Sequence, residues 1–166
     1  MGSDALRLLV DSREPSPHPW AAHWAAAHVR GTITTGDISL PGCERLVCIE
    51  RKTTDDLISC LTTNRDRFSR ELARAQAIPH FWVVCEGSYS DLLAGRYRSA
   101  MDSRAAFQSV VALMTRYRVP FLMAGPVRVA AELTESLLLK WYREHIKVVE
   151  LVTKNQGVYL ERNASC

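Results

Sequence analysis

Short apolar runs that end in charged residues or in glycine recur along the chain, and they constrain the fold more than any other feature. Runs this short and this apolar are typical of strands buried in a sheet, because buried helices are usually longer. Pro41 and Gly42 mark a turn between two of these strands. The predicted strands lie in 6–15, on either side of the turn within 32–52, in 81–87 and in 119–125.

Between and after these strands lie stretches with the period of helices. The predicted helices are 19–30, a helix capped by Thr53 or Thr54 that runs to about Leu61, 64–77, 103–118 and 126–147. Strands that alternate with helices indicate an α/β fold with a central mixed sheet flanked by helices. The chain of 166 residues is predicted to form one domain over 1–147, followed by a short tail at 148–166.

The composition excludes several classes of protein. No apolar window of about 18 residues exists, so we expect no membrane span, and no signal peptide precedes the first strand. The five cysteines match no zinc-binding spacing, and Cys48 and Cys85 lie inside apolar runs. We therefore expect a cytoplasmic protein of a prokaryotic or viral host, or a nuclear protein if the source is eukaryotic.

The apolar run 47–49 leads directly into the charged triplet Glu50-Arg51-Lys52. Burying such charges costs several kcal/mol per ion unless a partner compensates them. Because side chains alternate along a strand, Glu50 and Lys52 should face one side of the sheet and Arg51 the other. Further acids stand at or beside strand ends, namely Asp11, Glu14 and Asp37.

Acids gathered in this way can be held together by a hard divalent cation, which binds carboxylate, water and phosphate oxygens. A lysine beside the cation can position an attacking water, help to deprotonate it, or hold the charge of a phosphate. An acid such as Asp37 followed by Glu50-x-Lys52 is therefore the layout of a metal-dependent phosphodiesterase. The alternative is a surface ion-pair cluster, since many strands carry such residues by chance.

Longer motifs surround this triplet. The first predicted strand ends in Val10-Asp11-Ser12-Arg13-Glu14, and Gly36-Asp37 is followed by Glu50-Arg51-Lys52 and then by Asp56. Arg67-Phe68 and Glu86-Gly87 follow later in the chain. In this order and spacing the motifs resemble the nuclease domain of the XPF family of structure-specific endonucleases, including archaeal Hef, in the PD-(D/E)xK superfamily. The resemblance covers roughly residues 6–146.

The resemblance implies a restriction-endonuclease-like fold and a Mg²⁺- or Mn²⁺-dependent DNA endonuclease that acts on branched or flap-like DNA. It implies that Asp37 and Glu50 bind the metal and that Lys52 is the catalytic lysine. It also implies that Asp11 is a further or water-mediated metal ligand. Arg13 and Arg51 would organise the site or contact phosphate. Glu14 and Asp56 would be supporting residues, with Asp56 orienting one of those arginines. Helix N-terminal electrostatics alone would also explain Asp56.

The arginine-rich stretch 64–77 offers candidate contacts to DNA. The resemblance favours Arg67, with Arg65, Arg70 and Arg74 as further candidates in the same stretch. Arginine suits phosphate because its planar guanidinium matches two phosphate oxygens. The alternative is a solvated helix face, which is what most charged helical stretches are.

Members of the family usually continue into a tandem helix-hairpin-helix module, and no segment after about residue 147 is long enough for one. We expect a homodimer or heterodimer that forms through the C-terminal helices within 107–146. Two alternative functions remain at this stage. One is a restriction-, repair- or phage-type nuclease that cuts plain duplex or single-stranded DNA. The other is a catalytically silent scaffold that binds DNA or a partner subunit.

Overall fold

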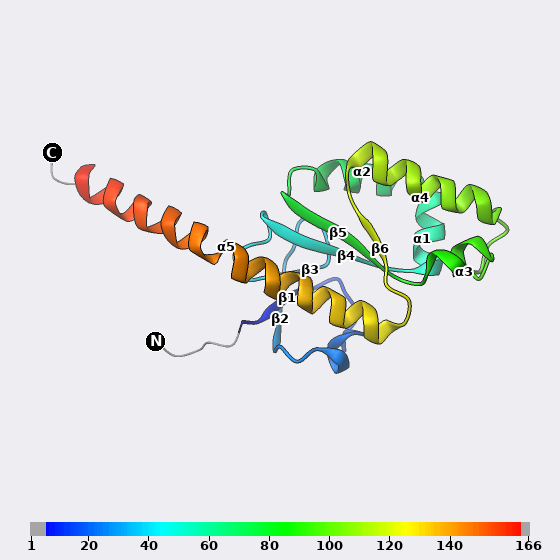
Figure 1. Cartoon of the computed structure of the whole chain (residues 1–166), viewed down its shortest axis with the longest axis horizontal. Helices are drawn as coiled ribbons and strands as arrows, with labels where there is room; N and C mark the ends of the chain where they lie inside the picture. Colours follow the sequence, from blue (N-terminus) through cyan, green and yellow to red (C-terminus); the bar gives the residue numbers. More distant parts are fainter. Residues whose placement is uncertain (1–5, 164–166) are drawn as a thin grey trace.

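Six strands form one mixed sheet in the order β2-β1-β3-β4-β5-β6 (Figure 1). The computed structural model describes residues 6–163, with side chains described for 6–146. The strands are β1 (Leu8–Asp11), β2 (His28–Gly31), β3 (Ile38–Ser39), β4 (Val47–Thr53), β5 (His80–Glu86) and β6 (Phe121–Met123). Strand β3 pairs antiparallel with β1 and β4, and the other neighbours pair in parallel. The predicted α/β fold with a central mixed sheet is therefore confirmed.

In the described part of the chain, five α-helices flank the sheet. Helices α1 to α4 gather on one side of it, while α5 crosses the other (Figure 1). They are α1 (Thr54–Leu61), α2 (Arg65–Ala75), α3 (Tyr89–Leu93), α4 (Ser103–Tyr117) and α5 (Val127–Asn163). A short 3₁₀ helix, η1, spans Ala21–His23. Among the described residues, no helix is both long enough and apolar enough to cross a membrane.

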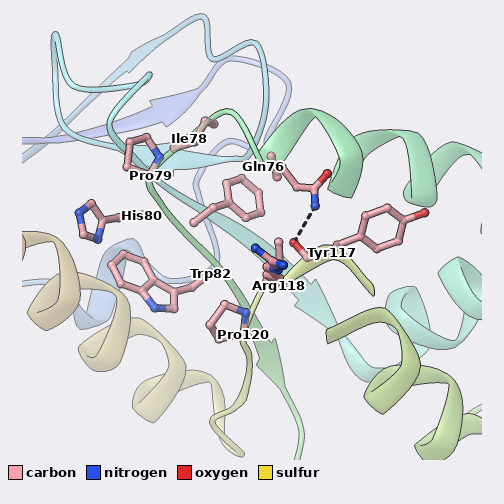
Figure 2. Close-up of a pocket in the computed structure, with 11 residues that line it drawn as sticks. Gln76, Ile78, Pro79, His80, Trp82, Tyr117, Arg118 and Pro120 are labelled. Carbon is pink, nitrogen blue, oxygen red and sulfur yellow. Dashed lines mark hydrogen bonds between the residues drawn. The ribbon is translucent and has the colours of Figure 1, made fainter. Parts of the chain in front are cut away.

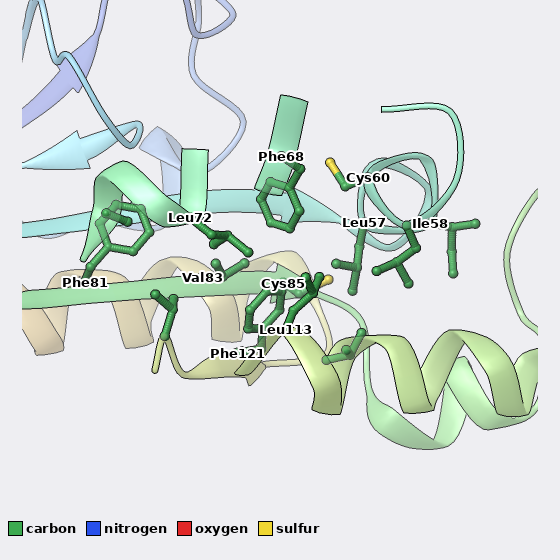
Figure 3. Close-up of a cluster of buried hydrophobic side chains, with 14 of the residues drawn as sticks. Leu57, Ile58, Cys60, Phe68, Leu72, Phe81, Val83, Cys85, Leu113 and Phe121 are labelled. Atoms are coloured by element: carbon green, nitrogen blue, oxygen red, sulfur yellow. The ribbon is translucent and has the colours of Figure 1, made fainter. Parts of the chain in front are cut away.

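Two hydrophobic cores lie on the two faces of the sheet, and the alternation of side chains along β4 divides them. Cys48 joins Phe68 and Leu72 of α2 in the core that α1, α2 and α4 cover (Figure 3). Val47 and Ile49 point the other way, into the core with α5. Because side chains alternate along a strand, this pattern continues into the charged residues and sends Glu50 and Lys52 towards α2 and Arg51 towards the α5 face.

The predicted helix over 19–30 is wrong. Residues 21–23 form a single 3₁₀ turn, and His28–Gly31 forms β2, which pairs in parallel with β1. Its alanine content favours a helix, but tertiary contacts outweigh that local preference. Trp20 and Trp24 are both buried under α5, and the guanidinium of Arg30 donates to the carbonyls of residues 12, 14 and 15.

Three other boundaries differ from the prediction. The sequence did not predict α3, a short helix that a capping box of Ser88 and Asp91 begins. Residues 32–36 form a connecting loop, and β3 is limited to Ile38–Ser39. Helix α5 runs without interruption from Val127 to Asn163, through the point where a tail was predicted to begin. The domain boundary at residue 147 stays a prediction, and Cys166 lies outside the described residues.

Candidate active site

The directions of the strands bring four acids to one edge of the sheet. Strands β1, β4 and β5 run in the same direction, so their carboxyl ends, which carry Asp11, Glu50 and Glu86, meet at that edge. Strand β3 runs the opposite way and begins there, directly after Asp37. The backbone N–H of Asp11 donates to the carbonyl of Asp37 at 2.8 Å, and that of Asp37 donates to the carbonyl of Ile49 at 2.8 Å. Clefts at the carboxyl ends of such strands are the usual ligand sites of α/β sheets.

Gly36 explains how Asp37 reaches this position. Its φ of +92° is one that other residues rarely adopt. A Cβ atom at Gly36 would collide with the Cys48 sulfur and would lie 3.1 Å from the Phe81 ring. The Gly-Asp pair therefore lets the chain pass directly over β4. The carboxylate of Asp37 then accepts a hydrogen bond from the backbone N–H of Arg51 at 2.8 Å.

Glu50 and Lys52 lie on the same face of β4, as the alternation predicts. The Lys52 ammonium donates to Glu50 Oε1 and lies 5.3 Å from the centre of the Phe68 ring. Glu50 is only 2% exposed, and its second oxygen, Oε2, is buried without a hydrogen-bond partner. A buried carboxylate oxygen without a partner is unfavourable. A bound cation would satisfy it.

The carboxyl groups of Asp37 and Glu50 lie where their charged forms are unfavourable. Burial raises the pKa of Asp37 to about 6, although the charge of Lys52 opposes the shift. Burial also raises the pKa of Glu50 well above its ordinary value, and repulsion from Asp37 adds to this. A carboxylate on α2, that of Glu71, raises both pKa values further. A divalent cation between Asp37 and Glu50 would reverse this effect, because it favours their charged forms.

Lys52 carries its positive charge in this environment. Burial alone would lower its pKa, but the charge of Glu50 and the hydrogen bond to it, together with Asp37, raise the pKa above the ordinary value. The ammonium is therefore fixed as a cation beside two acids. This arrangement suits the stabilisation of negative charge on a phosphate better than the removal of a proton from water.

Arg51 lies on the opposite face of the sheet, where its guanidinium contacts the carboxylates of Glu14 and Glu86. Its Nε and Nη2 donate to Glu86 Oε1 at 2.9 and 2.8 Å, and Nη1 lies 3.5 Å from Glu14 Oε2. Its guanidinium also lies 5.4 Å from the centre of the Trp20 ring, and its side chain is 12% exposed. These contacts leave the Arg51 side chain little freedom to reach DNA. They favour the first of its two predicted roles, which is to organise the site.

Glu14 and Glu86 are in turn bonded to His18 and Trp20. His18 is 3% exposed, and its Nδ1 accepts a hydrogen bond from the backbone N–H of Trp20. The Nε2 atom of His18 lies 3.1 Å from Glu14 Oε2. The indole N–H of Trp20 donates to Glu86 Oε1 at 2.7 Å. The pKa of Glu14 is lowered because the bond to His18 and the charge of Arg51 outweigh the effect of burial. Glu14 therefore contacts the Arg51 guanidinium, and its supporting role in the site stays a prediction.

Asp11 bonds to the loop that precedes Asp37, and its role as a further or water-mediated metal ligand stays a prediction. Asp11 is 1% exposed, and both of its oxygens are engaged. Oδ1 accepts from the backbone and side chain of Arg13, and Oδ2 accepts from the Ile33 N–H at 2.6 Å. Burial opposes these bonds, but together they lower the pKa of Asp11. Asp11 thus fastens the loop that precedes Asp37, and Arg13 helps by donating to the Ile33 carbonyl at 2.7 Å.

Asp56 caps α1 and contacts neither of the arginines that it was predicted to orient. Its carboxylate accepts from the hydroxyl and N–H of Thr53, and its own N–H donates back to the Thr53 hydroxyl. This capping box satisfies the first turn of the helix locally, so the carboxylate stays with Thr53. The simpler explanation from helix electrostatics therefore accounts for Asp56.

Substitution of Asp56 separates a helix cap from a role in the site. We expect Asp56→Ala to lower the free energy of unfolding by about 1 kcal/mol, as the loss of a helix cap does, and to leave any cleavage activity within about twofold. Asp91→Ala removes the equivalent cap of α3 and is the matched control. A large loss of cleavage in Asp56→Ala at unchanged stability would restore a direct role in the site.

The predicted DNA contacts Arg65, Arg67 and Arg70 are all exposed on α2, while Phe68 between them is buried. Glu71, Trp20 and His18 also lie next to the site, and no sequence motif pointed to them. Glu86 was marked only as part of a motif. Sequence patterns indicate such residues only weakly, because each reaches the site through a contact with a residue far away in the sequence.

The residues present fit a divalent cation held by two carboxylates. Among the described residues, no group of three or more His, Cys, Asp and Glu side chains is placed to bind a metal. Mg²⁺ commonly uses one or two carboxylates and completes its coordination with water and substrate phosphate. Asp37 and Glu50, with the unpartnered Glu50 Oε2, meet that requirement.

A separate pocket of about 390 Å³ lies at the other end of β5 (Figure 2). Its walls include His80, Trp82 and Arg118, and Gln76 donates to the Tyr117 carbonyl across one side. Because β4 and β5 are parallel with Glu50 beside Val83, this pocket is distant from the carboxylates. It contains none of the predicted site residues.

The mixed sheet, with two acids and a lysine at one edge, is the α/β architecture that the sequence predicted. The chain belongs to the ERCC4 domain family, whose model matches residues 10–137. No curated protein matches the chain. The family predicted from the motifs is therefore confirmed.

Two solved structures show the same fold. XPF from Aeropyrum pernix matches with a TM-score of 0.63 and 22% sequence identity, over 87% of this chain and 69% of that one. XPF from Aeropyrum pernix in complex with DNA matches with a TM-score of 0.61 and 21% identity, over 84% of this chain and 66% of that one. At this identity the likeness extends to the fold, which the sequence predicted.

Proposed function

We propose that this protein is a DNA endonuclease that depends on Mg²⁺ or Mn²⁺ and hydrolyses phosphodiester bonds in branched or flap-type DNA. Membership of the ERCC4 domain family and the XPF-like fold support a DNA endonuclease. The observation that carries the metal-dependent part is the pair Asp37 and Glu50, in which Glu50 Oε2 is buried without a partner. The relative in complex with DNA supports DNA as the substrate.

The residues of the chain supply position and charge for this reaction. A divalent cation bound by Asp37 and Glu50 would polarise the phosphate and lower the pKa of a coordinated water. The Lys52 ammonium would stabilise negative charge that develops on the phosphate. Arg51 acts through its backbone, because its N–H holds Asp37 while its side chain is anchored by Glu86. Asp11 and Arg13 hold the loop before Asp37.

Pairing with a second subunit is also part of the proposal. The latter part of α5 extends beyond the rest of the molecule (Figure 1), and such an extension provides a surface for a homodimer or heterodimer. Leu113, Leu138 and Trp141 are buried inside the chain. They are therefore part of the core, and the dimer surface would use other residues of these helices.

The test is cleavage of a labelled 3′-flap substrate and its matching duplex in Mg²⁺, Mn²⁺ or EDTA. We expect cleavage with either metal and none in EDTA, because two clustered carboxylates need a cation to act on phosphate. Glu50→Gln keeps the shape of the side chain and is the inactive control. Faster cutting of plain duplex than of the flap would overturn the branched substrate. Equal cutting in EDTA would overturn the dependence on metal.

A further inference from the structure

A polar pocket of about 440 Å³ lies at the C-terminal end of α2, beside the turn that leads into β4. Its lining includes the three threonines of the loop 32–35, which are Thr32, Thr34 and Thr35, together with Arg45 and Arg74. Glu44 also reaches the rim, but its Oε1 accepts from the Gly42 N–H at 2.9 Å and stays with its own turn. Two guanidinium groups and three hydroxyls make a wall suited to an anion.

The polar groups of this pocket are unused. Among the described residues, neither Arg45 nor Arg74 forms an ion pair with an acid, although other exposed arginines do, such as Arg96 with Asp91. Thr35 is 7% exposed, and no side-chain hydrogen bond involves its hydroxyl within the same part of the chain. The hydroxyl oxygen of Thr35 nevertheless remains accessible. The pocket therefore offers accessible hydroxyls as well as two exposed charges.

The pocket is linked to the candidate active site by two elements. The loop 32–35 contains Ile33, whose N–H and carbonyl are held by Asp11 and Arg13. On α2, Arg74 lies one turn beyond Glu71, and the charge of Glu71 reaches both Asp37 and Glu50. One helical turn is about 5.4 Å long, and successive phosphates of a strand rise by about 3.4 Å along duplex DNA. A pocket one to two helical turns from Glu71 is therefore within reach of a phosphate a few nucleotides from a scissile bond at the carboxylates.

We propose that Arg45, Arg74 and the threonines of the loop 32–35 form a second phosphate-binding subsite, which takes a phosphodiester group of the DNA strand a few nucleotides from the scissile bond. The proposal rests on the proposed function, because it assigns the subsite to the substrate of that nuclease. The arginines supply charge, and the threonine hydroxyls supply hydrogen bonds. Such a subsite fixes the position of the strand and reads no base.

The test measures binding of a labelled oligonucleotide by fluorescence anisotropy in EDTA, over a range of salt concentrations. For the double variant R45A/R74A we expect binding several-fold weaker than that of the wild type. We also expect the slope of log affinity against log salt to fall by about 0.7 to 0.9 for each arginine removed. In cleavage assays with metal, KM should rise while kcat stays near the wild-type value, since the subsite touches no reacting atom.

Two further variants separate the subsite from general effects of charge. T32V/T34V removes hydroxyls without changing charge, so binding should weaken several-fold at an unchanged salt slope. Arg128→Ala removes one positive charge from the first turn of α5, on the other face of the sheet. It should leave affinity nearly unchanged. All of the substituted side chains are exposed, so thermal unfolding should match the wild type.

The outcomes distinguish this proposal from the proposed function. If the wild type binds and cuts DNA but R45A/R74A has the affinity and salt slope of Arg128→Ala, the subsite is overturned and the nuclease remains. If the wild type neither retains an oligonucleotide nor cleaves one, both are overturned. A loss of kcat at unchanged affinity in R45A/R74A would also overturn the subsite, because it would place these arginines in the chemical step.

Discussion

Asp37→Asn is expected to reduce cleavage about a thousandfold or more, because a metal bound by this carboxylate supplies several kcal/mol of transition-state stabilisation. At the same time the metal-free variant should be more stable than the wild type at neutral pH. Burial raises the pKa of Asp37 to about 6, so the folded protein resists the ionisation that the unfolded chain allows. Asparagine has the same shape and removes that cost.

The sign of the pH dependence follows from this shift. A carboxyl group whose pKa is raised on folding costs no stability below its unfolded pKa of about 3.9. The cost grows as the pH rises towards about 6 and is complete above it. In EDTA the wild type should therefore gain stability as the pH falls from 7 to 4.5, by about 2 kcal/mol from this residue. Asp37→Asn should lack this gain.

Chemical denaturation at pH 7 and pH 4.5, with and without Mg²⁺, measures both effects. Asp66→Asn changes an exposed carboxylate on α2 and is the matched control. Added Mg²⁺ should stabilise the wild type at pH 7 and should not stabilise Asp37→Asn. Cleavage by Asp37→Asn at close to the wild-type rate would remove Asp37 from the site, whatever the stability data show.

Glu86→Ala is expected to lower the free energy of unfolding by about 3 kcal/mol, the cost of leaving a buried charge without its partner. Arg51 would lose its two bonds to Glu86 Oε1, and the Trp20 indole would lose its acceptor. Cleavage should fall by about 10- to 100-fold, as is typical when a residue that orients a metal site is removed. The reason is that Arg51 holds Asp37 through its backbone N–H.

The matched control is Glu132→Ala. Glu132 also pairs with an arginine, Arg128 at 2.9 Å, but both side chains are more than half exposed. Exposed pairs contribute about 0 to 1 kcal/mol, so this variant should remain near the wild type in stability and in cleavage. Equal destabilisation by Glu86→Ala and Glu132→Ala would show that the buried pair of Glu86 and Arg51 contributes no more to stability than an exposed pair. Urea denaturation and flap cleavage are the measurements.

Much of the fold could be predicted because the local signals agree with the tertiary structure. The apolar runs before Glu50 and before Glu86 form central strands, and Thr53 caps α1 as expected. The segment 19–30 could not be predicted in this way. Its composition favours a helix, whereas pairing of His28–Gly31 with β1 and burial of Trp20 decide its structure. Both depend on residues that lie elsewhere in the sequence.

The candidate site shows the same division. The sequence by itself determined that Glu50 and Lys52 share one face of β4 while Arg51 takes the other, because side chains alternate along any strand. The motifs likewise marked Asp37 and its glycine. Only the tertiary structure decided that Asp11 fastens a loop, that Asp56 caps a helix, and that Glu86 and Trp20 hold Arg51. The physical reason is that a carboxylate bonds to whichever donor the fold brings within about 3 Å, and the order of residues along the chain does not specify that donor.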